Sequence, residues 1–501
     1  MSLMGLDVGL TGCKAVIFNP EGHLLAQSYR EYGLYQPQPG WMELDPGEVW
    51  DSVKLVIREA VVAVPQDPVR AFAISTHGES VVPLDQHGNP IGRFISALDT
   101  RAMKEAEYWE KRLGRERIFK LTGTPLHPMY SINKLMWLKA NEPEIYSKSR
   151  HFVCMADFLY SRFGFAPTMD YSLAARTMAF NPQMLKWSDE ILDLAGIDKS
   201  QLSNPLPGGT VIGEVGSAIT AELGLPKGVL AVVGGHDQPS GAIGCGAVSE
   251  GVAMDSTGTV ECIALSTQHL VLDLNLLASN IPVASHAVPG MYLTFGWATS
   301  AGSLLRWFRD NFSAYEQAEA AKTGKDVYDL ILEQSTDEIS PVLILPHFAG
   351  SATPMMDPKS KGAILNLDTS TTRAQIIKGL MESITYEIKF TVDAMVAADM
   401  EINEIRAFGG GARSEKWLQV KADILNKPII AMDVAEVPCL GMAILAGTAI
   451  KEFSSIADGV KQMVRSKRTY YPNPTKNQQY SERFALFSQI YPTLKSLNHQ
   501  M

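Results

Sequence analysis

A glycine turn near the start of the chain combines residue types that can hold a phosphate. Asp7, Gly9, Thr11 and Lys14 form the pattern Asp-x-Gly-x-Thr-x-x-Lys. Glycine lets the backbone approach a phosphate closely, threonine donates a hydrogen bond, lysine supplies positive charge, and the carboxylate can reach Mg²⁺ or its waters. The alternative is a β-hairpin with a polar turn, and one such turn does not decide between the two.

Two later segments extend this pattern. Residues 255–259 read Asp-Ser-Thr-Gly-Thr and resemble the first turn, about half the chain length after it. Residues 409–414 read Gly-Gly-Gly-Ala-Arg-Ser and stand between an apolar segment and a helix-like segment. Consecutive glycines allow close contact with a flat ligand such as adenine. A plain strand–helix turn is the alternative for the glycine run.

Asp237 is the candidate base. It follows an apolar segment, residues 229–233, and two glycines, and Pro239 indicates that a helix starts there. The carboxylate would then lie near a helix N-terminus, whose partial positive charge favours the ionised form. An ionised carboxylate at the end of a strand is well placed to accept a proton. The alternative is a helix N-cap, and the adjacent His236 can be structural or catalytic.

A polar cluster in the first half could hold a sugar. Glu79 and Asp99 can accept hydrogen bonds from hydroxyl groups, and Arg101 can hold a carboxylate or a hydroxyl. His77 belongs to the same cluster. Taken singly, each of these residues, and Lys14 as well, can also be an ordinary solvated side chain.

Composition and missing motifs exclude several classes of function. The 501 residues carry a formal charge of −10, which argues against a nucleic-acid partner bound by bulk charge. The five cysteines include no C-x-x-C pair, so a zinc site or a redox dithiol is not expected, and their scatter suggests a reducing cytosol. We see no signal peptide and no apolar run of about 20 residues for a membrane span. No G-x-x-x-x-G-K-[ST] motif and no properly placed G-x-G-x-x-G motif is present.

The elements that position the first turn can be predicted from apolar patterning and turn residues. Strands are predicted at residues 3–7, 14–18 and 24–29, which form a β-meander. The first clear helix is predicted over residues 46–64. Asp45 is its expected N-cap, Pro46 stands at its first position, and Glu48 completes a capping-box pattern.

The rest of the chain predicts a duplicated α/β architecture. Strands are expected at residues 69–75 and 80–84, mostly helices over 100–200, and a strand at 229–233. The repeated acid–glycine–threonine turn suggests two related α/β domains with a cleft between them. We place the boundary between residues 1–247 and residues 248–501.

Together, these motifs resemble those of the FGGY carbohydrate kinases, which include xylulokinases, fuculokinases, gluconate kinases and glycerol kinases. The resemblance spans nearly the whole chain. It rests on seven segments in order, at residues 7–14, 40–50, 99–101, 235–246, 258–259, 345–362 and 409–417.

The resemblance implies an actin-like, ribonuclease-H-like duplicated fold that closes around ATP and Mg²⁺, with the sugar on the N-terminal domain. It implies that Asp237 accepts the proton of the substrate hydroxyl and that Asp7 holds Mg²⁺, with water between them as an alternative. The implied sugar contacts are His77, Glu79, Asp99, Arg101 and Asp237. The implied ATP contacts are Gly9, Thr11, Lys14, Gly258, Thr259, Gly302, Gly410, Gly411, Ala412 and Ser414.

Departures from the family pattern leave the substrate open. Leu10 stands where threonine is common, and Ala97 stands where a tryptophan often precedes the Asp-x-Arg pair. Residues 257–261 lean toward fuculokinases, whereas residues 127–129 lean toward some gluconate kinases. Gly78 stands where glycerol kinases have arginine, which argues against glycerol.

We therefore predict an ATP-dependent kinase of a small sugar, a ketose such as a pentulose or hexulose, in the cytoplasm. A polyol or aldonate kinase remains an alternative, as do an actin-like ATPase switch and a catalytically weak sugar sensor. The expected partner is the small-molecule sugar, without nucleic acid or membrane, and a homodimer stays open.

Overall fold

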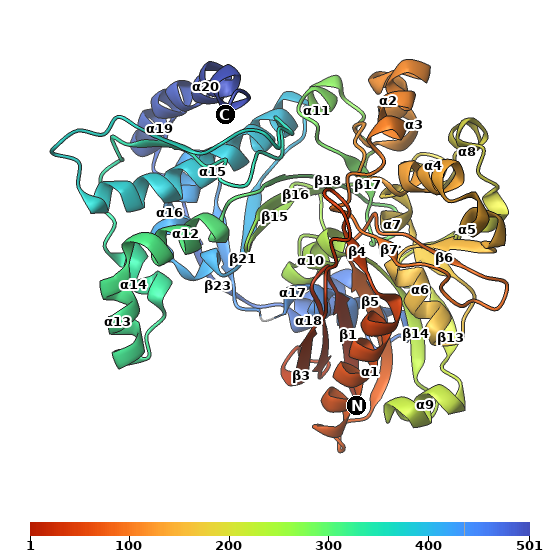
Figure 1. Ribbon diagram of the computed structural model, residues 1–501. Coiled ribbons are helices and arrows are strands. Elements are labelled where there is room, and N and C mark those ends of the chain that lie inside the picture. The colour runs from red at the N-terminus through yellow and green to blue at the C-terminus, as the bar shows by residue number, and fades with distance from the viewer. Residues whose placement is uncertain (435) are drawn as a thin grey trace.

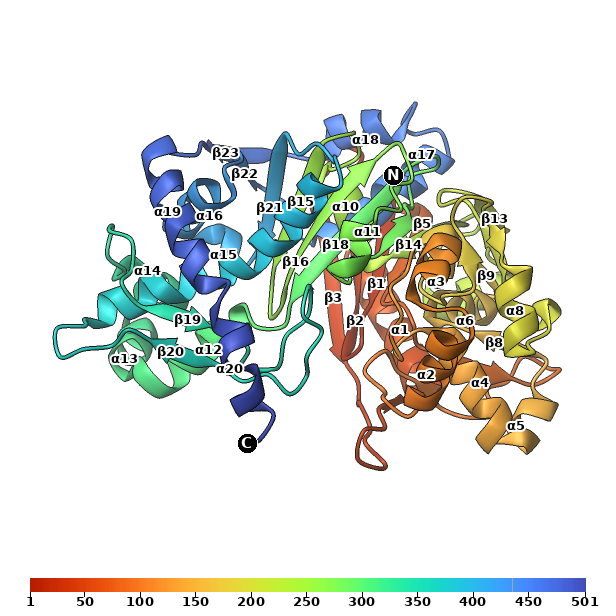
Figure 2. The ribbon, with the colours of Figure 1, turned by 90° about the horizontal axis from the view of Figure 1, so that it is seen from above.

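The computed structural model describes residues 1–434 and 436–501 and gathers most of its strands into two large mixed sheets (Figures 1 and 2). The first sheet has the order β13-β14-β5-β1-β2-β3. In it, β1 pairs antiparallel with β2 and parallel with β5, and β5 pairs parallel with β14. Its strands are β1 (Ser2–Val8), β2 (Gly12–Phe18), β3 (Leu24–Glu31), β5 (Val69–Thr76), β13 (Val211–Glu214) and β14 (Leu230–His236).

The second sheet repeats this topology. Its order is β17-β18-β16-β15-β21-β22-β23, and β15 pairs antiparallel with β16 and parallel with β21, as β1 does with β2 and β5. The predicted duplication of an α/β unit is therefore confirmed. Its strands are β15 (Val252–Thr257), β16 (Glu261–Thr267), β17 (Val283–Ser285), β18 (Tyr292–Ala298), β21 (Glu404–Gly409), β22 (Ile429–Met432) and β23 (Ser466–Tyr470).

Helices and short strand pairs cover both sheets. In the first half they are β4 (Glu43–Leu44), α1 (Pro46–Val62), β6 (Val82–Leu84), β7 (Phe94–Ile95), α2 (Met103–Arg112), α3 (Arg115–Thr122), α4 (Ser131–Asn141), α5 (Pro143–Lys148), β8 (His151–Val153), α6 (Met155–Arg162), β9 (Thr168–Asp170), α7 (Tyr171–Ala175), β10 (Phe180–Asn181), β11 (Lys186–Trp187), α8 (Asp189–Ala195), β12 (Asn204–Leu206), α9 (Ser217–Leu223) and α10 (Asp237–Cys245). In the second half they are α11 (Leu274–Ala278), α12 (Gly302–Phe312), α13 (Ala314–Thr323), α14 (Val327–Glu333), β19 (Leu343–Leu345), β20 (Ala363–Leu365), α15 (Arg373–Ala397), α16 (Glu415–Leu425), α17 (Val437–Ala449), α18 (Ile456–Met463), α19 (Pro474–Phe487) and α20 (Ile490–Asn498).

The N-terminus of α1 departs from the prediction in one detail. Asp45 caps the helix as expected, accepting from the backbone N–H groups of Gly47 and Glu48. Glu48, however, does not complete a capping box. Its carboxylate instead accepts from the N–H of Gly33 at 3.0 Å and from the hydroxyl of Tyr35 at 2.8 Å. The loop that follows β3 thus supplies the donors, and this ties α1 to the meander.

Two glycine-bearing helices cross between the sheets, near the centre of Figure 1. A Cβ at Gly244 of α10 would lie 1.8 Å from the carbonyl oxygen of Val437, and one at Gly441 of α17 would lie 2.0 Å from that of Ser240. The two backbones therefore touch, which only glycine permits. In addition, a Cβ at Gly5 of β1 would lie 1.9 Å from a carbonyl oxygen of α17.

Helix α17 thus packs on the first sheet although it comes from the second half of the chain. The proposed boundary between residues 247 and 248 remains a prediction. Among the described residues, no helix has the length and apolar character needed to cross a membrane.

Candidate active site

A cavity of about 200 Å³ lies where the two halves of the chain meet. Parallel strands β1, β5 and β14 end at the same edge of the first sheet, where ligands of α/β sheets commonly bind. Four residues predicted from the sequence meet there, each at or just beyond a strand end. The cavity is lined by Asp7, Gly9, His77, Asp237, Gln238 and Gly241 from the first half, and by Met254, Ser256, Phe408 and Pro438 from the second.

Asp7 lies near the end of β1. Its Oδ1 accepts from the hydroxyl of Ser75 on the neighbouring strand at 2.8 Å. Burial raises the pKa of Asp7 to about 6, and the nearby charge of Asp237 adds to the shift. Lys14 opposes it, but Lys14 itself forms an ion pair with Glu436, just before α17. The predicted phosphate cation is therefore engaged with a carboxylate from the other half of the chain.

Asp237 is the first residue of α10, directly after β14. The strand runs on to His236, beyond its predicted end, because Gly234 packs against β5, where a Cβ would lie 2.0 Å from the carbonyl oxygen of Ile74. The Nε2 of His236 lies 3.1 Å from Oδ1 of Asp237, whose side chain keeps 36% exposure at the cavity.

Opposing effects act on the ionisation of Asp237. Burial, followed by the charge of Glu79, raises its pKa to about 6, while a hydrogen bond from the backbone N–H of Gln238 in the first turn of α10 favours the ionised carboxylate. Desolvation is the largest of these effects. The result suits a base, because a carboxyl group with a pKa of about 6 is largely ionised at neutral pH and is more basic than an ordinary aspartate.

Glu79 has an unusual backbone conformation and is held through both its backbone carbonyl and its side-chain carboxylate. Its backbone has φ of +65°, in the left-handed region that side chains other than glycine rarely adopt. Its carbonyl oxygen accepts from the hydroxyl of Ser131 at 3.0 Å and from the ammonium of Lys134 at 2.9 Å. Its carboxylate pairs with Arg176, which lowers the pKa of Glu79 against the cost of burial. Such strain persists only when the surroundings over-determine it, and it is typical of functional sites.

His77 lies in the catalytic cavity as a neutral imidazole. Burial lowers its pKa. Its Nε2 lies 2.7 Å from the hydroxyl of Ser80, and its Nδ1 lies 3.2 Å from the carbonyl oxygen of Val8. The ring is therefore held in place by contacts on both nitrogens.

Asp99 and Arg101 lie away from the catalytic cavity. Asp99 accepts from Nε and Nη2 of Arg101 at 2.9 and 2.7 Å and from the N–H of Met42 at 2.6 Å. The guanidinium also reaches Glu43 at 2.8 Å and stacks on Trp41, with 3.8 Å from its central carbon to the ring centroid. The two side chains are buried and satisfy each other. Their predicted contact with a sugar stays a prediction.

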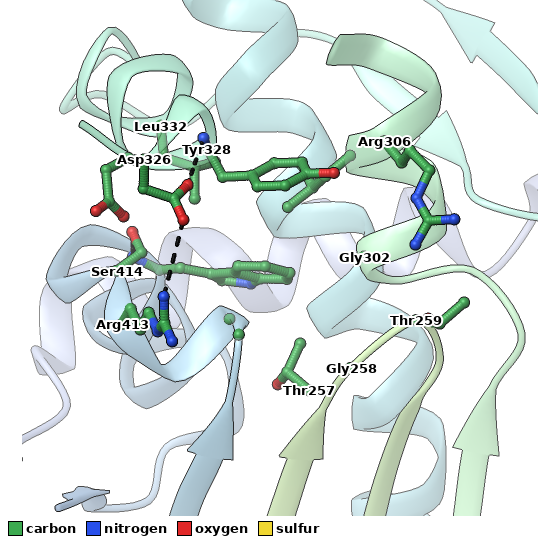
Figure 3. A pocket seen from close by; sticks show the side chains of 15 residues that line it. Thr257, Gly258, Thr259, Gly302, Arg306, Asp326, Tyr328, Leu332, Arg413 and Ser414 are labelled. Atoms are coloured by element: carbon green, nitrogen blue, oxygen red, sulfur yellow. Dashed lines mark hydrogen bonds and ion pairs between the residues drawn. The ribbon is translucent and has the colours of Figure 1, made fainter. Parts of the chain in front are cut away.

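A second cavity of about 200 Å³ lies in the second half of the chain (Figure 3). It collects six of the residues predicted to contact ATP: Gly258, Thr259, Gly302, Gly410, Gly411 and Ser414. Tyr328 and Leu332 of α14 lie across it from the turn at Gly258, as Figure 3 shows. Together with Trp417 they form walls that suit a flat aromatic base.

The glycines of this second cavity fit a nucleotide. A Cβ at Gly302 would lie 2.5 Å from the carbonyl oxygen of Gly258, and one at Gly411 would lie 2.5 Å from the side chain of Thr257. A Cβ at Gly258 or Gly410 would meet nothing nearer than 3.8 Å, so both backbones stay open to the cavity. Backbone N–H groups in such turns can hold phosphates.

A larger cavity of about 860 Å³ joins the two sites. It shares Gly258 and Gly410 with the nucleotide cavity and Ser256, Phe408 and Pro438 with the catalytic cavity, and it includes Ala412. The large cavity therefore borders both the nucleotide cavity and the cavity that holds Asp237. Thr11 is exposed and lines none of these three cavities, and neither does Lys14.

The contacts of Asp255, the counterpart of Asp7 in the second sheet, indicate a structural role. Its Oδ2 lies 2.5 Å from the ammonium of Lys421 on α16, which also contacts the hydroxyl of Thr257 at 2.6 Å and Glu261 at 2.9 Å. Asp255, Glu261 and Lys421 are all fully buried. Burial and the charge of Asp255 raise the pKa of Glu261, which favours its protonated form. The cluster anchors the turn at residues 257–259 to α16.

Sequence reasoning missed the residues that surround Glu79. Lys134 and Arg176 come from segments that the sequence marks only as helical, and a single lysine or arginine in such a segment carries no functional signal. Tyr328, a wall of the nucleotide cavity, was also missed, because no motif was recognised in its segment. Only residues 127–129, which include His127 beside the same cations, had stood out as a pattern.

Comparison with known proteins gives consistent matches over the whole chain. Two models describe the FGGY family of carbohydrate kinases; its N-terminal domain matches residues 2–244 and its C-terminal domain matches residues 253–450. A xylulose kinase of Staphylococcus epidermidis is 28% identical over 500 residues, covering 99% of this chain and 97% of the relative. A gluconokinase of Bacillus subtilis is 26% identical, covering 99% and 96%. The crystal structure of a ligand-bound xylulose kinase from Lactobacillus acidophilus superposes with a TM-score of 0.89 at 23% identity, covering 99% and 98%.

Proposed function

Because the chain belongs to the FGGY family of carbohydrate kinases, we propose that this phosphotransferase moves the terminal phosphoryl group of ATP to a hydroxyl of a small sugar, with Asp237 as the base. The observation that carries this proposal is the large cavity that borders both the nucleotide cavity and the catalytic cavity. It lets a base bound near Tyr328 extend its phosphates past Gly258 and Ser256 toward Asp237.

In the proposed mechanism, the sugar hydroxyl lies beside Asp237, in line with the terminal phosphorus of ATP. The new O–P bond forms while the bond to the leaving ADP oxygen breaks, and the hydroxyl proton passes to Asp237. In a loose transition state the proton leaves late, so an aspartate is basic enough to accept it. Most of the rate enhancement then comes from positioning, which the rigid start of α10 supplies.

The phosphates would lie between the two glycine turns. Gly258 and Thr259 approach them from the second half, and Gly9 from the first. Thr11 and Lys14 stay predicted contacts, which a closer approach of the two halves would bring nearer.

Magnesium fits this site through Asp7. Among residues 1–434 and 436–501, no group of three or more His, Cys, Asp or Glu side chains gathers to hold a metal. Phosphate oxygens and waters would therefore supply most of the ligands, with Asp7 reaching the ion through water. When bound, Mg²⁺ would neutralise charge on the phosphates.

Several compound classes are proposed for the substrate, whereas a single reaction is proposed. The relatives include a xylulose kinase and a gluconokinase, so a ketose and an aldonate both remain candidates, and a polyol is a third. That the protein works in the cytoplasm is a further prediction, and whether it forms a homodimer stays open.

The test is ATP consumption with pentuloses, hexuloses, aldonates and polyols, with Mg²⁺ present and a blank without sugar. Strong stimulation by one class, abolished in Asp237→Asn, would support the proposal. High turnover in the blank with no stimulation would instead favour an ATPase switch. No turnover with any compound would favour a sugar sensor and would refute the proposal.

A further inference from the structure

An ion pair joins the first glycine turn to the segment that leads into α17. The ammonium of Lys14 donates to Oε2 of Glu436, and the two residues are 422 positions apart in the chain. Each side chain keeps 27% exposure, so the pair is accessible to a ligand. Ion pairs at such exposure add little to stability, so stability alone gives a poor account of this one.

The pair lies at the border of the catalytic cavity and the large cavity. Lys14 on β2 stands directly opposite Asp7 on β1, and side chains paired in this way lie on the same face of a sheet. Asp7 lines the catalytic cavity, whereas Glu436 lines the large cavity. Pro438, two residues beyond Glu436, lines both. The ammonium of Lys14 therefore lies between a residue of one cavity and a residue of the other, on the proposed course of the phosphates.

The catalytic cavity needs positive charge for phosphoryl transfer. Two carboxylates line it, and no lysine or arginine is among its described lining residues. Burial raises the pKa of Asp7, while the charge of Lys14 opposes this shift and that of Glu436 adds to it. Both partners of the ion pair therefore act on the cavity. An ammonium has three donors, and Glu436 takes one of them, which leaves two for phosphate oxygens.

Glu436 has a conformation that serves the ion pair. Its backbone has φ of +54°, in the left-handed region that residues with side chains rarely adopt. It stands at the N-cap of α17, yet its side chain makes no capping hydrogen bond with that helix, all of whose residues are described. The carboxylate turns to Lys14 instead. Such strain persists where the surroundings over-determine it, and it is typical of functional sites.

Both partners rest on elements that are packed together. Helix α17 packs on β1, where Gly5 lets the two backbones meet. The ammonium of Lys14 also lies 5.6 Å from the ring centroid of Tyr29, its neighbour on β3. A lysine side chain is long and flexible, so these contacts remove rotamer freedom before a phosphate arrives.

We propose that Glu436 is a positioning residue that holds the ammonium of Lys14 at this border, so that Lys14 meets the terminal phosphoryl group of ATP during its transfer. The inference rests on the proposed kinase function. An ion pair between a lysine and a glutamate is likewise required for the phosphate-binding lysine of protein kinases. Because Glu436 acts through Lys14, its removal should affect turnover more than the binding of ATP.

The test measures kcat and KM for ATP in variants of the full chain, with whichever of xylulose and gluconate gives the higher turnover. Glu436→Gln should lower kcat by about 10- to 100-fold and change KM for ATP by less than about threefold, because a misplaced ammonium weakens the transition state more than the ground state. Glu436→Asp, which keeps the charge, should recover part of the loss. Lys14→Met should lower kcat by about 10²- to 10³-fold.

A double variant shows whether Glu436 acts through Lys14. Lys14→Met with Glu436→Gln should be no slower than Lys14→Met alone, because no ammonium is left to position.

Glu452→Gln is the matched control. Glu452 lies just beyond the other end of α17 and pairs with Arg70 on β5 at 2.6 Å, and neither residue lines any of the three cavities. The exposure of this pair, 31% and 41%, is similar to that of Lys14 and Glu436. The variant should keep kcat and KM within about twofold of the wild type, and its midpoint of thermal unfolding should match that of Glu436→Gln.

The outcomes separate this inference from the function on which it rests. An unchanged kcat in Glu436→Gln would overturn the inference, and a raised kcat would do so by showing that Glu436 competes with phosphate for Lys14. Equal losses in the Glu436 and Glu452 variants, or a double variant slower than Lys14→Met, would also overturn it. In all these cases the kinase stands. Failure of every compound to stimulate ATP consumption in the wild type would overturn both.

Discussion

The ionisation of Asp237 should set the acid limb of the pH–rate profile. Burial, with the charge of Glu79, raises its pKa from 3.8 to about 6. A base acts in its ionised form, so kcat/KM should be full above that value and fall about tenfold for each pH unit below it. An aspartate at its ordinary pKa would keep the rate nearly constant down to about pH 5, where only about a tenth of a group with pKa 6 is ionised.

Asp7 adds a second titration to the same limb. Its pKa is also about 6, from burial and from the charge of Asp237. If both carboxylates must be ionised for activity, kcat/KM falls by up to about a hundredfold per pH unit at low pH. The two apparent pKa values then belong to the pair of carboxylates and not to either residue alone. Asp7→Asn should return the slope to about tenfold per unit, because one titrating group remains.

The assay needs a control for ATP, whose terminal phosphate titrates near pH 6 as well. Asp237→Asn should lower kcat by about 10²- to 10⁴-fold, the usual contribution of a positioned base. Its residual rate still carries the titrations of ATP and of Asp7, so the ratio of the wild-type profile to the variant profile isolates the titration of Asp237. A ratio that stays constant from pH 7.5 to pH 5, or a variant with near-normal turnover, would refute the assignment of the base.

Two structural predictions concern buried contacts. Lys421→Met should destabilise the second half by about 3–5 kcal/mol in urea denaturation, because Asp255 is left buried without its cation. Adding Asp255→Asn and Glu261→Gln should restore most of the lost stability. A loss of stability below about 1 kcal/mol in Lys421→Met alone would contradict this account. Gly244→Ala should cost about 1–3 kcal/mol and lower kcat, since its Cβ would lie 1.8 Å from a carbonyl oxygen of α17 and would displace α10. Gly216→Ala, where a Cβ meets nothing within 4 Å, is the matched control, and an equal effect there would remove the clash as the cause.

Local sequence signals predicted the turns and their neighbouring strands. The meander of the first sheet and the strand–glycine–helix segment at residues 404–425 match the structure, because turn residues and apolar runs act within a few positions of the chain. The same reasoning brought Gly258 and Gly410 to one cavity, and the resemblance to the kinase family added Gly302. The structure distinguishes the acids of the two turns, because Lys421 pairs with Asp255 whereas Asp7 lies at the catalytic cavity.

The sequence by itself determined the two glycine turns and the candidate base, because each depends on residues close together in the chain. The repetition of the turn about half a chain later indicated the duplicated architecture. The tertiary structure alone decided which charges meet. Arg176 and Glu79 are 97 residues apart, Lys14 and Glu436 are 422 apart, and no local pattern pairs them. It also raised the pKa of Asp237, because the desolvation that opposes the favourable helix N-terminus arises only when distant segments pack around the carboxylate.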